Sequence, residues 1–339
     1  MQLVYEIGKS DTVRPVLCLQ ENVVTGAADG YARMAGKPAF TLLHVGSGFA
    51  NGIANLHNAG RGNTPMVNIV GANASYHQPN FPEHEMIGGK IIDLARSVSH
   101  WAREAKSASE LGLLGAEAVR YAMTGSGKIC TLIAPTNCHW DPSAGVPVID
   151  APIATPRVSS DTVEATLELL SNGRKTGLLL GAQAIHHEGL ELVGRIAVKT
   201  GAQLLAETFP TRMARGEGRV QVQHVPYLLE MAQQFFAEYE QIILVGALPP
   251  VSTFAYQNKG MFKVPEGCEV THFASTNHDI VAALRDLEGA LDAGAAAAAR
   301  VDRAEPALPA GELTPKAIGQ SINLLMPEGA IVVDEATTA

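Results

Sequence analysis

Short apolar runs alternate with small-residue helical stretches through the first 135 residues, and this alternation constrains the fold more than any other feature. The apolar runs predict four strands, and the stretches between them predict three helices. The strands are expected at residues 16–19, 38–45, 66–70 and 129–134, and the helices at residues 22–34, 49–58 and 109–123. Strands that alternate with helices form a parallel sheet covered by helices on both faces. The first part of the chain is therefore predicted to be an α/β unit.

A second alternating block follows in the next part of the chain. Its helices are expected at residues 160–170, 188–200, 226–239 and 279–287, and its strands at residues 176–180, 203–206, 242–245 and 269–273. Ser160 or Asp161 is a suitable cap for the first of these helices. The block therefore predicts a second parallel sheet with covering helices.

Two stretches of unusual composition divide the chain. Four prolines lie between residues 141 and 156, and proline favours extended backbone. Residues 290–312 are rich in Ala, Gly and Pro. We predict domains at 1–140 and 160–289, linkers at 141–159 and 290–312, and the beginning of a third domain at 313–339, with a helix at 315–325 and a strand at 330–333. The predicted fold class is α/β, with two successive doubly wound parallel-sheet domains.

Composition excludes several classes of protein. Hydrophobic residues make up 46% of the 339 residues and charged residues 17%, which is typical of globular proteins with a large core. The net charge of −9, without a basic run, argues against a nucleic-acid partner. No run of 18 apolar residues predicts a membrane span, and the first residues do not resemble a signal peptide.

The four cysteines stand apart in the sequence, at positions 18, 130, 138 and 268. Their spacing argues against structural zinc, and we predict no metal ligands in this chain. A reduced, cytoplasmic setting is the expectation.

The most informative motif begins at Glu21, which follows an apolar run and precedes a small-residue helix. The helix ends in A-D-G-Y-A-R at residues 28–33, followed by Gly36. An acid at the start of a helix can simply satisfy free backbone N–H groups. The whole stretch, however, resembles the pyrimidine-binding domain of thiamine diphosphate enzymes of the acetolactate synthase, pyruvate oxidase and benzoylformate decarboxylase group. Ligand sites of open α/β sheets lie at the carboxyl ends of their strands, where Glu21 is predicted to be.

The resemblance implies a role for Glu21. In that group the glutamate hydrogen-bonds N1′ of the cofactor's aminopyrimidine, and the cofactor then attacks a 2-oxo acid. We therefore expect thiamine diphosphate as cofactor, Glu21 as a catalytic and cofactor-binding residue, and a 2-oxo acid as substrate.

A second motif carries His44, Gly46, Ser47, Gly48 and Asn51. His44 ends a predicted strand, and the glycines would let backbone approach a cofactor closely. In the benzoylformate decarboxylase branch a histidine at this position assists proton transfer. Acetolactate synthases usually have T-S-G-P-G-x-x-N here. The resemblance thus implies a catalytic His44, cofactor contacts from the other four residues and a decarboxylase-like reaction, whereas a strand-end histidine satisfied by backbone is the structural alternative.

The diphosphate-binding domain of the family is largely missing from the sequence. That domain binds Mg²⁺ through a G-D-G motif followed at a distance by Asn, and no G-D-G occurs in this chain. Residues 331–339 resemble its opening strand, and Thr337 and Thr338 align with positions that contact the diphosphate in some relatives. We expect the chain to be an incomplete copy, truncated at both ends and inactive by itself.

Alternative functions remain open. One is a non-catalytic α/β module for binding or subunit interaction, derived from the same family. Another is a nucleotide-dependent oxidoreductase that uses residues 160–287, which resemble a central domain that binds FAD in some relatives. The stretch 177–182 lacks a full G-x-G-x-x-G and a well-placed acid, so it is interpreted as packing.

Two further expectations concern surfaces and partners. The adjacent His186 and His187 are interpreted as a surface pair, because adjacent residues point in different directions. A homodimer or homotetramer is implied by the family, in which the cofactor lies between subunits.

Overall fold

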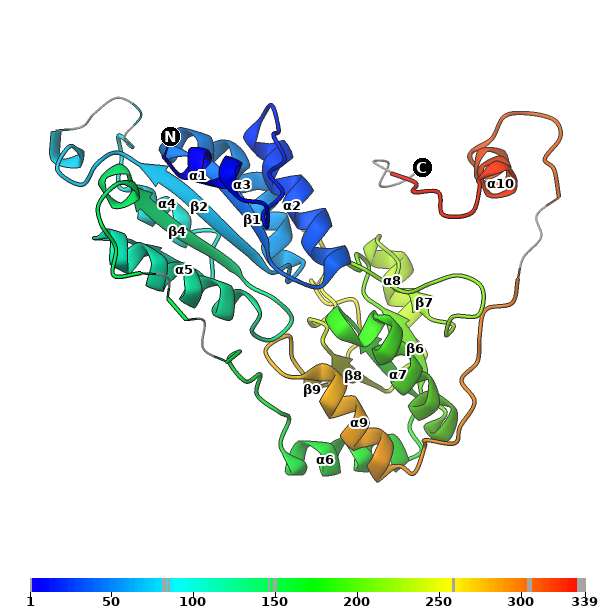
Figure 1. Cartoon of the computed structure of the whole chain (residues 1–339). Helices are drawn as coiled ribbons and strands as arrows, with labels where there is room; N and C mark the ends of the chain where they lie inside the picture. The colour runs from blue at the N-terminus through cyan, green and yellow to red at the C-terminus, as the bar shows by residue number, and fades with distance from the viewer. Residues whose placement is uncertain are drawn as a thin grey trace. The chain divides into compact units, whose positions relative to one another are not determined.

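The computed structural model describes residues 2–80, 84, 86–145, 147–148, 151–257, 260–303 and 307–333. Residues 1–214 and 222–298 form one compact unit, which contains two parallel sheets, and residues 215–221 and 299–339 form another (Figure 1). The α/β fold class with parallel sheets is thus confirmed. The exact domain boundaries given above stay a prediction.

The first sheet has the strand order β1-β2-β4-β3, with all neighbours parallel. Its strands are β1 (Ala39–His44), β2 (Met66–Ala72), β3 (Trp101–Glu104) and β4 (Ile129–Pro135). The helices around it are α2 (Glu21–Ala35), α3 (Val45–Arg61), α4 (Ile91–Arg96) and α5 (Ala108–Ala122).

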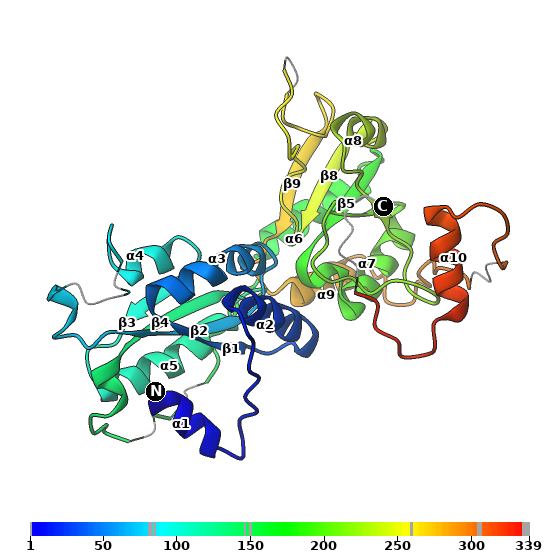
Figure 2. The same ribbon diagram turned by 90° about the horizontal axis from the view of Figure 1, so that it is seen from above.

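Helices cover both faces of this sheet, as Figure 2 shows. Phe49 and Leu56 of α3 and Ala28 of α2 pack in one cluster with Met66 and Ile133 of the sheet. On the other face Ala118 and Ala122 of α5 pack with Val67, Leu132 and Trp101. Successive strand residues therefore enter opposite clusters, as the strand pleat requires.

A polar ladder crosses the buried centre of the sheet. Asn68 is fully buried, and its Oδ1 accepts a hydrogen bond from Thr41 Oγ1 at 2.7 Å. Its Nδ2 donates to Cys130 O and to Thr131 Oγ1, each at 3.3 Å. Because buried polar groups are costly unless paired, this ladder specifies how β1, β2 and β4 align.

The second sheet has the order β7-β6-β5-β8-β9, again parallel. Its strands are β5 (Thr176–Leu180), β6 (Gln203–Ala206), β7 (Gln223–His224), β8 (Gln241–Val245) and β9 (Glu269–Ala274). The helices of this part are α6 (Ser160–Ser171), α7 (His187–Thr200), α8 (Leu229–Phe236) and α9 (Ile280–Ala290). A short 3-10 helix, η3 (Ala182–Ile185), follows β5.

Two predicted strands are wrong. Residues 16–19 are not a strand, and Leu17 and Leu19 are 90% and 97% exposed. Residues 330–333 are not a strand either, and Ile331 and Val333 are 89% and 91% exposed. In the part of the chain that the structure describes, neither run pairs with a sheet edge, and an apolar run without a hydrogen-bonding neighbour does not form a strand.

Four elements were not predicted from the sequence. They are α1 (Gln2–Lys9), α4, β3 and the two-residue β7. Strand β3 reads W-A-R-E, so no apolar run marks it, yet Trp101 and Ala102 are buried against the sheet. The C-terminal helix α10 (Pro315–Leu325) has the predicted bounds, with Thr314 Oγ1 accepting from Ala317 N as its cap.

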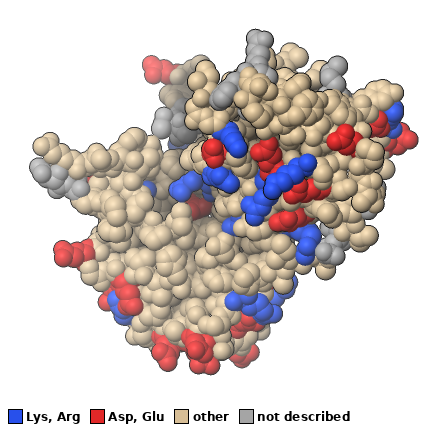
Figure 3. All heavy atoms as spheres, turned by 90° about the vertical axis from the view of Figure 1, so that its left-hand side faces the viewer, with Lys and Arg blue, Asp and Glu red and all other residues tan. Residues whose placement is uncertain are grey.

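No described helix is both long and apolar enough to cross a membrane. On the face drawn in Figure 3, basic and acidic side chains lie close to one another. Such intermixed charge suits a solvated surface.

We predict that Asn68→Ala lowers the free energy of unfolding by about 2–4 kcal/mol, because it leaves the Thr41 hydroxyl without its buried acceptor and opens a small cavity. Urea unfolding of both proteins measures this difference. Asn323→Ala, at an exposed position of α10, is the matched control and should change stability little. An equal loss in both variants would contradict a special role for the ladder.

Candidate functional site

Helix α2 presents Glu21 at its first position. Gln20 precedes the helix in an extended conformation, and its side chain accepts a hydrogen bond from Asn22 N at 3.1 Å. The helix ends at Gly36, whose φ of 63° is the left-handed conformation that favours glycine. A helix start is a favourable place for a carboxylate, so the local sequence explains why Glu21 is accommodated there.

Residues of α3 lie next to the Glu21 carboxylate. Asn51 Nδ2 donates to Glu21 Oε2 at 3.2 Å. A Cβ added to Gly48 would lie 3.2 Å from Glu21 Oε1 and 3.6 Å from His44 Cβ. Gly48 thus lies between Glu21 and His44, and only the absence of its side chain leaves this space open. Oε1 has no hydrogen-bond partner among the described residues and can accept one from a ligand.

Close packing of α2 against α3 holds this arrangement. Thr25 is fully buried, and its hydroxyl lies 3.0 Å from Gly52 O, to which it can donate. A Cβ on Gly52 would lie only 2.9 Å from Thr25 Cγ2. Asn55 Nδ2 donates to Asn22 O at 2.6 Å, which fixes the first turn of α2 to α3.

The turn from β1 into α3 is strained. His44 is the exposed last residue of β1, and Val45 has a φ of 47°. A β-branched residue rarely adopts this conformation, and such strain is often seen at functional sites. Next to it Gly46 is buried, and an added Cβ would collide with Met86 Sδ. The ring of His84 lies 6.4 Å from that of His44, centroid to centroid.

The structure thus brings Glu21, His44, Gly48 and Asn51 together. Gly46 is close to them in sequence but faces Met86, and Ser47 is exposed on α3. Thr337 and Thr338 lie outside the described residues. The catalytic and cofactor-binding roles of all these residues stay predictions.

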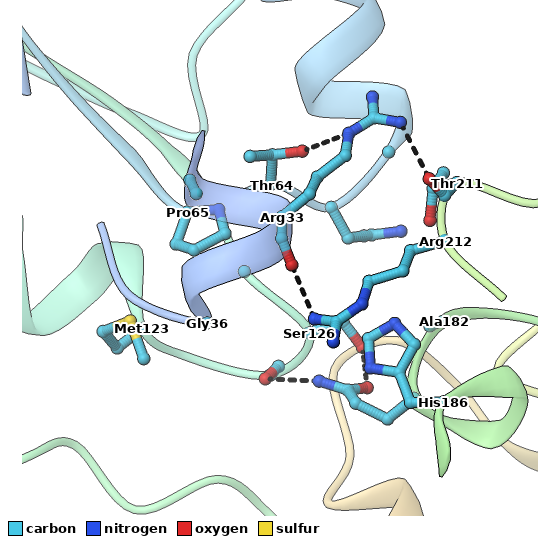
Figure 4. A pocket seen from close by; sticks show the side chains of 16 residues that line it. Arg33, Gly36, Thr64, Pro65, Met123, Ser126, Ala182, His186, Thr211 and Arg212 are labelled. Atoms are coloured by element: carbon cyan, nitrogen blue, oxygen red, sulfur yellow. Dashed lines mark hydrogen bonds between the residues drawn. The ribbon is translucent and has the colours of Figure 1, made fainter. Parts of the chain in front are cut away.

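The rest of the A-D-G-Y-A-R motif has a structural role. Arg33 Nε and Nη2 donate to the two carboxylate oxygens of Asp29, at 2.7 and 2.8 Å. Thr64 Oγ1 donates to Asp29 Oδ1 at 2.6 Å. Arg33 Nη1 donates to Thr211 O at 3.1 Å (Figure 4). The motif therefore joins the end of α2 to the loop before β2 and to residue 211.

A cavity of about 460 Å³ lies at the carboxyl edge of the first sheet. Ala72 and Ile133 from the ends of β2 and β4 line it, together with Gln78, Lys90 and Glu104. Gln78 Nε2 donates to Glu104 Oε1 at 3.1 Å. These polar residues do not stand out in the sequence, because β3 and α4, which position two of them, carry no strong sequence signal.

Glu207 is a second acid that the sequence analysis missed. It follows β6, and a Cβ on Gly181 after β5 would lie 3.1 Å from Glu207 Oε1. The acid that the stretch 177–182 was said to lack is therefore present, and its signal is an acid directly after an apolar run. Burial raises the pKa of Glu207 to about 7, although the positive charge of Arg61 acts in the opposite direction.

The structure corrects the prediction for one residue of the histidine pair. His187 is exposed, whereas His186 is half-buried and lines a cavity, so the prediction of a surface pair is wrong for His186. Among the described residues, no group of three or more His, Cys, Asp or Glu side chains could hold a metal ion.

Comparison with known proteins shows which family the first part of the chain resembles. Residues 1–94 match the family described as "Thiamine pyrophosphate enzyme, N-terminal TPP binding domain". The resemblance that the motif around Glu21 predicted is thus found over these residues.

Two curated relatives cover nearly the whole chain. It is 39% identical over 345 residues to the Mycobacterium tuberculosis protein named "Putative acetolactate synthase large subunit IlvX", covering 100% of this chain and 64% of that protein. It is 26% identical over 356 residues to benzoylformate decarboxylase of Pseudomonas aeruginosa, covering 96% of this chain and 64% of the relative. The chain thus spans 64% of the length of these curated relatives.

Solved structures share the fold. A thiamine diphosphate-dependent 4-hydroxybenzoylformate decarboxylase of Rhodococcus jostii RHA1 matches with a TM-score of 0.78 at 18% identity, covering 97% of this chain and 65% of that one. A thiamin diphosphate-dependent enzyme of Mycobacterium smegmatis, described as putative, matches with a TM-score of 0.76 at 21% identity, covering 94% and 64% of the two chains. At these identities the likeness establishes the fold alone.

We predict that Glu207→Gln stabilises the protein at neutral and alkaline pH. The folded pKa lies above the unfolded value, so stability falls as pH rises from about 4.5 through 7, and glutamine removes this loss. A gain of up to about 3 kcal/mol is expected at pH 8, shrinking toward pH 4.5. Thermal unfolding across this range measures it, with the exposed Glu164→Gln as control. A gain that does not depend on pH would contradict titration of Glu207.

Proposed function

We propose that this chain supplies the aminopyrimidine-binding half of a thiamine diphosphate-dependent enzyme that decarboxylates or ligates 2-oxo acids. One observation carries the proposal. The carboxylate of Glu21 is oriented by Asn51 and has one oxygen without a hydrogen-bond partner among the described residues, beside the space left by Gly48.

The donor set fits this half of the cofactor. An aminopyrimidine offers ring nitrogens and an exocyclic amino group, and Glu21 Oε1 would share a proton with one of the ring nitrogens. A charge-assisted hydrogen bond of this kind contributes about 1.5–3 kcal/mol. When bound, thiamine diphosphate supplies a carbanion-stabilising centre for cleavage or formation of the bond next to the keto group.

The residues around Glu21 have separate roles in the proposal. Glu21 holds the proton shared with the pyrimidine ring, and Asn51 fixes the direction of the carboxylate. Gly48 keeps the space beside Oε1 open. His44 is exposed at the strained turn into α3, next to Gly48, and in this proposal it exchanges a proton with a bound substrate.

The type of reaction follows from His44 and from the relatives. A histidine in this segment resembles the benzoylformate decarboxylase branch, and one relative carries that name. We therefore favour a carbon–carbon lyase acting on a 2-oxo acid over acetolactate synthesis. A cytoplasmic homodimer or homotetramer, with the second half of each cofactor site on another subunit, completes the proposal.

The second half of the site would require a Mg²⁺-binding G-D-G motif, and the sequence of 339 residues has none. A second candidate is a non-catalytic module that keeps the fold. The two candidates differ in whether a diphosphate-binding domain acts together with this chain.

We predict that the 339-residue chain by itself binds thiamine diphosphate weakly or not at all, because Glu21 supplies only one end of the cofactor site. Isothermal titration calorimetry with thiamine diphosphate and Mg²⁺ measures this. Tight binding by the wild-type chain that Glu21→Gln abolishes would refute the half-site and show that the chain is sufficient.

In a chimera that adds the remaining third of the Pseudomonas aeruginosa relative, we expect Glu21→Gln to slow exchange of the thiazolium C2 proton by about 10²–10⁴-fold. Hydrogen–deuterium exchange followed by NMR measures the rate. Glu6→Gln, at an exposed position of α1, is the control and should leave the rate unchanged. Equal rates in Glu21→Gln and the wild type would remove Glu21 from this role.

A further inference from the structure

A second cavity, of about 210 Å³, lies at the opposite end of α2 from Glu21. Arg33 and Gly36 from the end of α2, Ser126 before β4, and His186 and Arg212 line it (Figure 4). Arg33 lies twelve residues after Glu21 on α2, which corresponds to about 18 Å along the helix axis. The cavity is therefore distinct from the proposed cofactor site.

The charge of this cavity is unusual for a chain with a net charge of −9. Two arginines and a histidine line it, and none of the lining residues is an Asp or Glu. Arg33 forms an ion pair with Asp29, which is not among the residues that line the cavity. Arg212 has no carboxylate partner among the described residues, and its printed hydrogen bond is from Nη1 to the neutral Arg33 O at 2.7 Å. Its Nε and Nη2 donors remain available to a ligand.

His186 provides a second polar group, which becomes cationic only when its ring is protonated. Its ring nitrogens have no hydrogen-bond partner among the described residues, and Figure 4 shows the imidazole beside Arg212. Burial lowers the pKa of His186, and the charge of Arg212 lowers it further. The charged or titratable side chains that line the cavity with it are Arg33 and Arg212, so a bound anion would favour the protonated imidazole.

The volume and the charge of the cavity indicate which class of ligand it can bind. Pockets for drug-sized molecules measure about 300–1,000 Å³, so this cavity suits a smaller group. Arg212 carries one positive charge, and His186 gains a second one only when a bound anion favours protonation of its ring. A phosphate group carries about −1.5 to −2 at pH 7 and can match both charges, whereas a carboxylate, with one charge, matches only that of Arg212. Guanidinium donors also fit the oxygen geometry of phosphate.

We propose that this cavity binds a phosphate group, either inorganic phosphate or the end of a small phosphate ester, through Arg212 and His186. The site is independent of thiamine diphosphate. The cavity also lies between segments that are far apart in the sequence, because Arg212 and Thr211 contact Arg33. A bound anion there would hold residues 211–212 against the end of α2.

The test is calorimetric titration of sodium phosphate into the full 339-residue chain, at constant ionic strength and without thiamine diphosphate. Saturable binding with one site is expected. Arg212→Gln and His186→Gln should each weaken binding about tenfold or more, as loss of a charge-assisted hydrogen bond implies. Arg103→Gln is the matched control, since Arg103 is also exposed and donates to a backbone carbonyl, that of Ala102, but lies outside the cavity. It should leave the affinity unchanged.

Two further ligands distinguish the sources of the anion. Glycerol 3-phosphate tests a phosphate ester, and saturable binding of either phosphate compound supports the site. Acetate tests a carboxylate, and affinity equal to that of phosphate would overturn the assignment. The proposal also fails if neither phosphate compound binds, or if both variants bind like the wild type. Circular dichroism confirms that the variants fold, and if Arg212→Gln does not, His186→Gln decides.

Discussion

The close packing of helix α2 against helix α3 is the interaction on which the candidate cofactor site depends. It requires Gly52, where any side chain would press on the buried Thr25, and Gly48, where a side chain would press on Glu21. With these small residues the two helices approach until Asn51 reaches the Glu21 carboxylate. The Glu21 carboxylate is therefore oriented before a ligand binds, which makes the site preorganised.

The same helix has a second constrained end. Asp29 and Arg33 form a two-pronged ion pair, half-buried, that also engages Thr64 and the backbone of Thr211. The signature motif of this helix therefore combines two tasks, because Glu21 faces the candidate cofactor site and Arg33 secures the loops around the second cavity. Rigid elements that carry functional groups at their ends are common in α/β proteins.

Periodicity predicted most of the fold, and its failures have a common cause. Strands β2, β4, β5 and β8 are buried on both faces and therefore read as continuous apolar runs. Residues 16–19 show the same pattern but are exposed, because a strand also needs a neighbour to hydrogen-bond. Strand β3 shows the reverse, since its pairing with β4 overrides its polar composition.

The sequence by itself determined the α/β class and the resemblance to thiamine diphosphate enzymes, and it singled out Glu21, His44, Gly48 and Asn51 as one candidate site. These signals are local, because a motif and the spacing of apolar residues can both be read from residues that are neighbours in the sequence. Only the tertiary structure decided that Glu207 lies against Gly181 and is buried enough for its pKa to reach about 7. Desolvation and the convergence of charges, as at His186 and Arg212, depend on segments remote in sequence, and no local pattern encodes them.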